Sequence, residues 1–172
     1  MPATFRLIAS NTLSSSAASV TFSSIPATYT DLVVRTSTRT DRTGVAVSDL
    51  RIQLNGSSST VYSIRNLLGG YGSASSGSNT SQSYWQSDYS PTADAASNSF
   101  GSSEIYIPKY LTSTKKPSTS FGTSENTSSN SYLSAHANLA DITSAVSSIT
   151  ITAAIFNFVS GSSFYLYGIK NS

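Results

Sequence analysis

The sequence predicts an all-β protein, an antiparallel β-sandwich of jelly-roll type with about nine or ten strands in one domain, residues 1–172. Three observations lead to this prediction. Nearly every apolar run alternates with Ser or Thr, which together supply 60 of the 172 residues. No window carries the apolar stripe of an amphipathic helix, and Ser and Thr are poor residues for a helix interior. Turn residues separate the apolar runs at the short intervals typical of all-β proteins.

The predicted strands are short runs in which apolar and polar residues alternate. In chain order they lie at 5–7, 20–22, 31–38, 51–54, 61–67, 105–107, 132–139, 149–152 and 164–167. The run 132–139 separates its side chains most completely. One face holds Leu133, Ala135, Ala137 and Leu139, and the other holds Tyr132, Ser134, His136 and Asn138.

The segments between these runs carry turn and loop signals. The pair Asn55–Gly56 predicts a hairpin loop, and Pro108 predicts the end of the strand before it. Residues 141–145 are expected to form one helical turn. The low-complexity segments 72–83 and 113–131, rich in Ser, Thr, Gly and Asn, are expected to be long loops within the domain.

The residue types available restrict the chemistry. The chain has no cysteine and one histidine, so it predicts no disulfide, no zinc site and no cofactor. His136 is expected to be a solvated or interface residue on the polar face of its strand. Asp88 and Asp94 could bind an ion, although a solvated loop is the simpler interpretation. Glu104, Asp88 and Asp94 leave open a glycosidase, but the sequence favours a protein that is not an enzyme.

The charge pattern argues against two classes of partner. The formal net charge is +2, and only 10% of residues are charged, so a nucleic-acid partner is not expected. No apolar run approaches the roughly 18 residues of a membrane span, and the first residues lack the features of a signal peptide. A protein that does not bind membranes and is made in a cytoplasm is the expectation.

Two groups of residues are candidates for a protein interface. Arg35, Arg39 and Arg42 cluster in a chain with few charges, and Arg35 and Arg39 are expected on one face of a strand. They would contact an acidic partner, or simply keep a sheet edge soluble. Tyr84 and Trp85, near the serine-rich segment, would contact a protein or a sugar, or else pack their loop onto the sandwich.

Several strings resemble a group of small β-rich virion proteins of tailed bacteriophages. Each string is weak alone, but their order and spacing span the chain from about residue 5 to its end. The matching stretches are Val20-Thr-Phe-Ser-Ser-Ile-Pro26, Thr28-Tyr-Thr-Asp-Leu-Val-Val34, Arg51-Ile-Gln-Leu-Asn-Gly56, Tyr62-Ser-Ile-Arg65, Ser99-Phe-Gly101, Glu104-Ile-Tyr-Ile-Pro108 and Phe164-Tyr-Leu-Tyr-Gly-Ile-Lys170.

The resemblance implies a structural protein with a jelly-roll-like sandwich. Such proteins decorate (cement) capsids or form head fibres or tail-fibre modules, commonly as trimers. The expectation is a homotrimer that binds the major capsid protein on the outer capsid surface, after assembly in the host cytoplasm. A tail-fibre or receptor-binding module that recognises host glycans is the alternative, and a free carbohydrate-binding module or glycosidase is the third hypothesis. The resemblance transfers no catalytic or binding residue.

Overall fold

A computed structural model describes residues 4–70, 72–124 and 131–170. Within these ranges the chain forms twelve β-strands and no helix, which confirms the all-β prediction. The strands are β1 (Phe5–Thr12), β2 (Ser19–Phe22), β3 (Asp31–Thr38), β4 (Val47–Leu54), β5 (Tyr62–Gly70), β6 (Ser73–Gln82), β7 (Trp85–Pro91), β8 (Gly101–Ile107), β9 (Lys116–Thr123), β10 (Tyr132–Ala140), β11 (Ile149–Thr152) and β12 (Ser163–Ile169).

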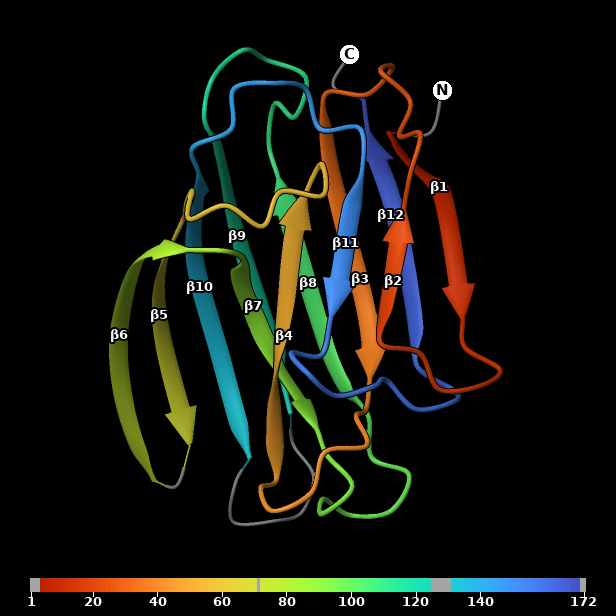
Figure 1. The fold of residues 1–172 in the computed structure, drawn as a ribbon, viewed down its shortest axis with the longest axis vertical. Coiled ribbons are helices and arrows are strands. Elements are labelled where there is room, and N and C mark those ends of the chain that lie inside the picture. The colour runs from red at the N-terminus through yellow and green to blue at the C-terminus, as the bar shows by residue number, and fades with distance from the viewer. Residues whose placement is uncertain (1–3, 71, 125–130, 171–172) are drawn as a thin grey trace.

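The strands form two antiparallel sheets of unequal size (Figure 1). The large sheet has eight strands in the order β1-β12-β3-β8-β9-β10-β5-β6, and the small sheet has four in the order β2-β11-β4-β7. The small sheet lies over the central part of the large one, whereas β5 and β6 extend beyond it at one side. The large sheet therefore has one part that is covered and one part that projects.

The two halves of the chain pair with each other in nested fashion. β1 pairs with β12, β2 with β11, β3 with β8 and β4 with β7, all antiparallel. These eight strands make the small sheet and the β1-β12-β3-β8 part of the large sheet. The other four strands, β9, β10, β5 and β6, extend the large sheet from β8 outward. We call them the four-strand extension.

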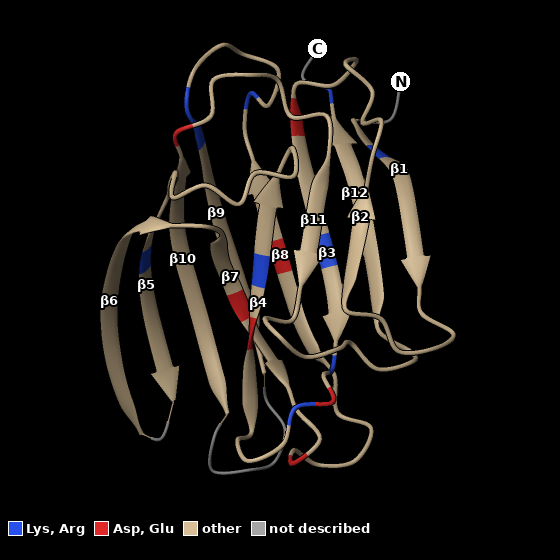
Figure 2. Cartoon of the chain, viewed as in Figure 1, with Lys and Arg blue, Asp and Glu red and all other residues tan. Residues whose placement is uncertain are grey.

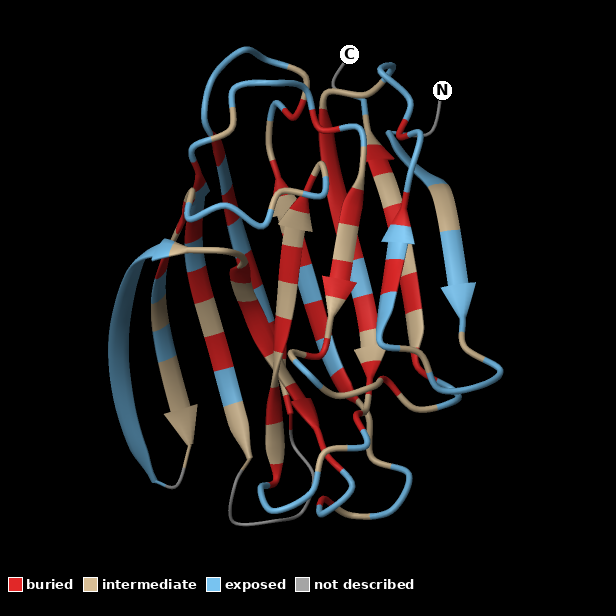
Figure 3. Ribbon diagram, viewed as in Figure 1, coloured by how far each residue is buried: buried red, intermediate tan, exposed pale blue. Residues whose placement is uncertain are grey.

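The apolar core lies between the sheets (Figure 3). Both sheets contribute alternate residues to it, as the period-2 pattern predicts. Trp85 from the small sheet meets Tyr62 from the large sheet edge to face, with ring centroids 5.9 Å apart. Phe158 and Phe164 pack in the same way at 5.0 Å.

The prediction of nine or ten strands is too low, because β6, β7 and β9 were missed. β6 and β9 lie inside the two segments expected to be loops, and the part of the second segment at 125–130 is outside the described residues. Both strands consist mainly of Ser, Thr, Gly and Asn. Their neighbours supply the backbone ladder, so they become strands without an apolar pattern of their own.

The turn predictions are partly right. Asn55 and Gly56 take positive φ angles of 52° and 66°, and the Ser57 amide donates to the Leu54 carbonyl across the turn at 3.0 Å. However, this turn joins strands of different sheets, so it is not a hairpin. The end of β8 before Pro108 is confirmed, whereas residues 141–145 form no helical turn.

Candidate interaction surface

In the four-strand extension, β9 and β10 carry their large apolar side chains on the outside. In β9 and β10, the buried residues are Lys116, Ser118, Ser120, Gly122, Ser134, His136, Asn138 and Ala140. The opposite face shows Phe121 and Leu133, which are 59% and 51% exposed. A sheet normally buries its apolar face and exposes its polar one. The expected solvated position of His136 is therefore wrong, because this part of the sheet has the reverse polarity.

Neighbouring strands continue the exposed apolar surface. Phe121, Ala135 and Leu67 lie side by side across β9, β10 and β5. Leu67 is 64% exposed, and Leu139 further along β10 is 38% exposed. We call this side of β8, β9, β10, β5 and β6 the outer apolar face. Soluble monomers rarely expose contiguous apolar patches of this kind unless they bind something.

A groove of about 830 Å³ runs along the outer apolar face. Ala135 and Ala137 are small and form its floor, while Phe121 and Leu67 flank it. Arg65 on β5 and Glu104 on β8 line the groove, which continues past β5 to Ser76–Ser78 of β6. The surface therefore combines a hollow, two large apolar side chains beside it, and one charge of each sign.

A buried polar layer lies on the other side of the same strands, beneath β7. It consists of Ser87, Asp88, Ser103, Ser120, Ser134 and His136, each at most 5% exposed. A β-bulge in β7 leaves Ser87 outside the register with β4, so that Ser87 and Asp88 both point inward. The Ser120 hydroxyl donates to the Ser87 carbonyl at 2.6 Å, and the Ser134 hydroxyl donates to the Asp88 carboxylate.

Asp88 is the dominant electrostatic feature of this layer. Burial raises the pKa of its carboxyl to about 7, and the hydrogen bond from Ser134 offsets only part of that rise. Gly122 on β9 makes room for the carboxyl, because a Cβ at Gly122 would overlap it. The expectation that Asp88 lies in a solvated loop is wrong, since the carboxyl sits between the sheets.

His136 is perturbed in the opposite sense. Burial lowers the pKa of its imidazole to about 4, and the negative charge of Asp49 opposes that shift. Neither ring nitrogen has a hydrogen-bond partner among the described residues. The Tyr89 ring lies 6.4 Å from the imidazole and helps to cover it. The imidazole is therefore neutral at pH 7.

The three candidate arginines do not form one site. Arg35 projects from the outer face of the large sheet, where Nη2 approaches Glu104 Oε2 at 2.6 Å. Its guanidinium also lies over the rings of Phe5 and Tyr167, at 5.5 and 5.9 Å from their centroids. Arg39 follows the end of β3 at Thr38 and does not share this face. Figure 2 shows how widely the few charges are spread.

Arg39 holds a loop in place. Its Nη1 donates to the carbonyls of Ala96 and Ser99 at 2.7 and 3.1 Å, and its Nη2 donates to that of Ala95 at 3.1 Å. Arg39→Lys should lower the free energy of unfolding by about 2 kcal/mol, because one ammonium cannot span this set of carbonyls. Urea denaturation followed by circular dichroism measures the loss.

The matched control for Arg39 is Arg42→Lys. Arg42 lies 5.1 Å from the Phe156 ring centroid in a partly exposed position. Its replacement should cost less than about 1 kcal/mol. Equal losses in the two variants would contradict the loop-holding role of Arg39.

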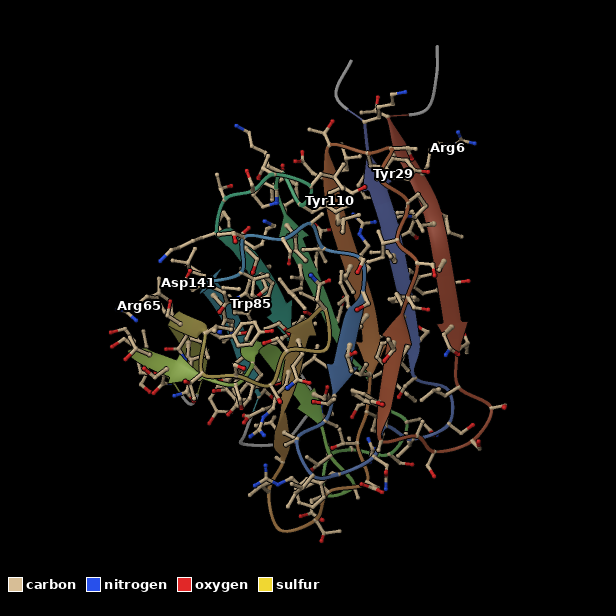
Figure 4. All side chains as sticks on the ribbon, turned by 45° about the horizontal axis from the view of Figure 1, so that its top comes forward. Arg6, Tyr29, Arg65, Trp85, Tyr110 and Asp141 are labelled. Atoms are coloured by element: carbon tan, nitrogen blue, oxygen red, sulfur yellow. The ribbon has the colours of Figure 1, made fainter. Side chains whose placement is uncertain are left out.

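Tyr84 and Trp85 have different environments. The Arg51 guanidinium lies 4.1 Å from the Tyr84 ring centroid, and Tyr84 is partly exposed. Trp85 is fully buried at the start of β7, where it lies between the two sheets (Figure 4). The prediction that Trp85 forms a surface contact is therefore wrong, because its ring is part of the core.

The carboxylates suggested for a glycosidase do not converge. Glu104 lies on the outer face of the large sheet, whereas Asp88 lies between the sheets. Asp94 is exposed and accepts a hydrogen bond from the Gly44 amide. Among residues 4–70, 72–124 and 131–170, no three His, Asp or Glu side chains gather as metal ligands. That part of the chain also holds no helix that is long and apolar enough to cross a membrane.

The residues of the outer apolar face were not singled out from the sequence. The alternation of Leu133, Ala135, Ala137 and Leu139 was visible, and it marked a continuous apolar face. What it did not indicate was that this face points outward. Phe121 and Leu67 gave no signal, because their strands were not recognised as neighbours of β10.

No family model matches this sequence, and no curated protein matches it. The fold and its surfaces are therefore the basis for a functional proposal.

Proposed function

We propose that this chain is a structural protein of a tailed-bacteriophage virion, a capsid decoration (cement) protein that binds the outer surface of the major capsid protein and stabilises the lattice. It acts as a homotrimer and by adhesion rather than by catalysis. It assembles in the host cytoplasm and resides on the outer capsid surface. The observation that carries the proposal is the outer apolar face on a two-sheet frame, which suits the contact between copies that a homotrimer needs.

The winding of the chain supports a jelly-roll sandwich. Without the four-strand extension, the sheets read β1-β12-β3-β8 and β2-β11-β4-β7. Each neighbouring pair joins an early strand to a late one, from β1–β12 inward to β4–β7. A long antiparallel hairpin rolled into two sheets gives this order, which is the jelly-roll arrangement found in viral capsid domains. The extension would then be an elaboration of that frame.

The exposed composition is compatible with a role on a particle surface. β6 is exposed along nearly its whole length and carries only Ser, Ala, Gly, Asn, Thr and Gln. Such a surface is polar but almost uncharged, so it resists nonspecific binding to charged partners. Many weak contacts repeated over a lattice give firm attachment without a single tight site.

The proposal is tested by the location and copy number of the protein. Mass spectrometry of virions from the phage that encodes it should find hundreds of copies per particle, and heads stripped of it should lose heat resistance. A few copies per particle would indicate the tail instead. Absence from purified virions, or unchanged heat resistance after stripping, would contradict a cementing role.

A tail-fibre module that binds host glycans is the second candidate, and an aromatic cluster favours it. Phe5 and Tyr167 lie 4.8 Å apart between ring centroids, and Tyr165 stacks near Tyr167 at 6.5 Å. Aromatic faces on an exposed sheet are suitable platforms for sugar rings. A glycan array with host-envelope sugars separates the candidates, since no binding would count against the fibre role.

A further inference from the structure

We infer that the outer apolar face is the contact between copies of this chain, with the β8–β9 side of one copy seated on the β10–β5–β6 side of the next, and that three such contacts close a ring. This inference assigns the surface through which the proposed homotrimer forms. It rests on the proposed function only for the number of copies, three. Self-association does not depend on where on a virion the protein resides.

The reversed polarity of β9 and β10 is the first step in this argument. Leu67, Phe121 and Leu133 are each more than half exposed, while serines fill the opposite side. Exposing three large apolar side chains together is unfavourable by about 25 cal/mol for each Å² left in water. A partner that covers them removes this cost.

The shape of the face fits a copy of itself. Phe121 stands out from β9, and the adjacent groove has Ala135 and Ala137 at its floor. A projection and a hollow thus lie side by side on one surface. When the β9 side of one copy meets the β10–β5 side of another, Phe121 enters the hollow of its neighbour.

The charges that line the groove match in the same arrangement. Arg65 is exposed on β5 (Figure 4), and it has no acidic partner among the described residues. Glu104 lies on β8, and both of its contacts to Arg35 use Oε2. Its Oε1 can accept a further hydrogen bond. Seating the β8–β9 side on the next copy brings Glu104 of one chain to Arg65 of another.

The face also supplies both contacts that a ring of copies needs. Five adjacent strands spaced about 4.8 Å apart, each about seven residues long, cover roughly 600 Å² of flat area. In a ring this area is divided between two neighbours, so each copy covers about half of it, roughly 300 Å² of flat area, against each one. The contact joins two different sides of the face, so it is heterologous and closes only as a ring.

Sedimentation equilibrium of the purified chain is the first test. The wild type should sediment as a trimer, with three times the 18.0 kDa chain mass. Phe121→Asp should raise the dissociation constant at least about 30-fold, as expected for the loss of an interface hot spot. The matched control is Ile155→Asp, because Ile155 is 88% exposed but lies between β11 and β12, outside this face. It should leave the trimer intact.

Disulfide cross-linking tests the arrangement itself. The chain has no cysteine, so Arg65→Cys combined with Glu104→Cys introduces the only two thiols. These positions are three strands apart, at roughly 15 Å, which is too far for a disulfide within one chain. Oxidation should give covalent trimers on a non-reducing gel, whereas either single variant should give no trimer.

Three results would overturn this inference. A wild-type monomer at 100 µM or so would leave the face to another partner, such as the capsid surface. A trimer that Phe121→Asp does not weaken would place the contact elsewhere, provided circular dichroism shows the variant folded. A covalent dimer as the end product would exclude the three-copy ring. None of these results depends on the virion measurement, so the two proposals can fail separately.

Discussion

Asp88→Asn is expected to stabilise the protein at pH 8 and to change how its stability depends on pH. The carboxyl has a pKa of about 7 in the folded chain, against an ordinary value of 3.8. Between these values the folded state holds a proton that the unfolded state releases. The contribution of Asp88 to the free energy of unfolding therefore falls as the pH rises from about 4 to about 7, by about 4 kcal/mol in all. An amide removes this loss and can still accept the Ser134 hydrogen bond.

His136 opposes Asp88 in the wild type. Its pKa is about 4 when folded and 6.5 in the unfolded reference, so the unfolded state takes up a proton that the folded state refuses. Its contribution to stability is lost as the pH falls through this window, by about 3 kcal/mol. The wild-type free energy of unfolding should thus be nearly flat from pH 4 to 6.5. In Asp88→Asn it should rise with pH over the same range.

Urea denaturation at pH 4.5, 6 and 8, followed by circular dichroism, measures this profile. Asp94→Asn is the control, because it removes an exposed carboxylate outside the buried polar layer and should retain the flat wild-type profile. Gly122→Ala offers an independent check, since its methyl group competes with the Asp88 carboxyl for the same space. An Asp88→Asn profile parallel to the wild type would refute the buried titration.

The strands that the sequence could predict are those with their own apolar alternation. β3, β8, β10 and β12 match their expected positions because each presents alternate apolar residues to a neighbour. β7 was missed for a specific reason. Its bulge turns two consecutive residues inward, which breaks the period-2 pattern.

The sequence pattern within β10 could not predict which of its two faces is buried. Its polar face is buried because β7 brings Asp88 over Ser134, so buried hydroxyls and a carboxyl supply part of each other's hydrogen bonds. That contact joins residues 46 positions apart in the chain. A pattern within one strand shows that two faces differ, and only the tertiary contacts decide which face is covered.

The candidate arginines lie in different environments for a similar reason. Arg35 lies on the outer face beside Glu104, but Arg39 comes after β3 has ended and turns toward backbone carbonyls. A spacing of four places two residues on one strand face only if the strand continues through both. The sequence suggested that these arginines could make contacts. Which groups they contact depends on the fold.

Trp85→Ala should cost about 3–5 kcal/mol of the free energy of unfolding, the usual range for removing a buried aromatic side chain. The ring is fully buried and meets Tyr62 across the two sheets at 5.9 Å. Its loss opens a cavity where β7 joins the core, at the strand that also carries Asp88. Urea denaturation by far-UV circular dichroism is the appropriate measurement, because Trp85 is the only tryptophan and the variant has no indole fluorescence.

The neighbouring residue supplies the matched control for Trp85. Tyr84 is partly exposed and contacts Arg51, so Tyr84→Ala should cost only about 1 kcal/mol. Trp85→Phe should fall between the two variants. It leaves a smaller cavity, and it also removes an indole N–H that has no hydrogen-bond partner among the described residues. A Trp85→Ala loss no larger than that of Tyr84→Ala would mean that Trp85 does not join the two sheets. The prediction that both residues contact a partner at the surface would then stand.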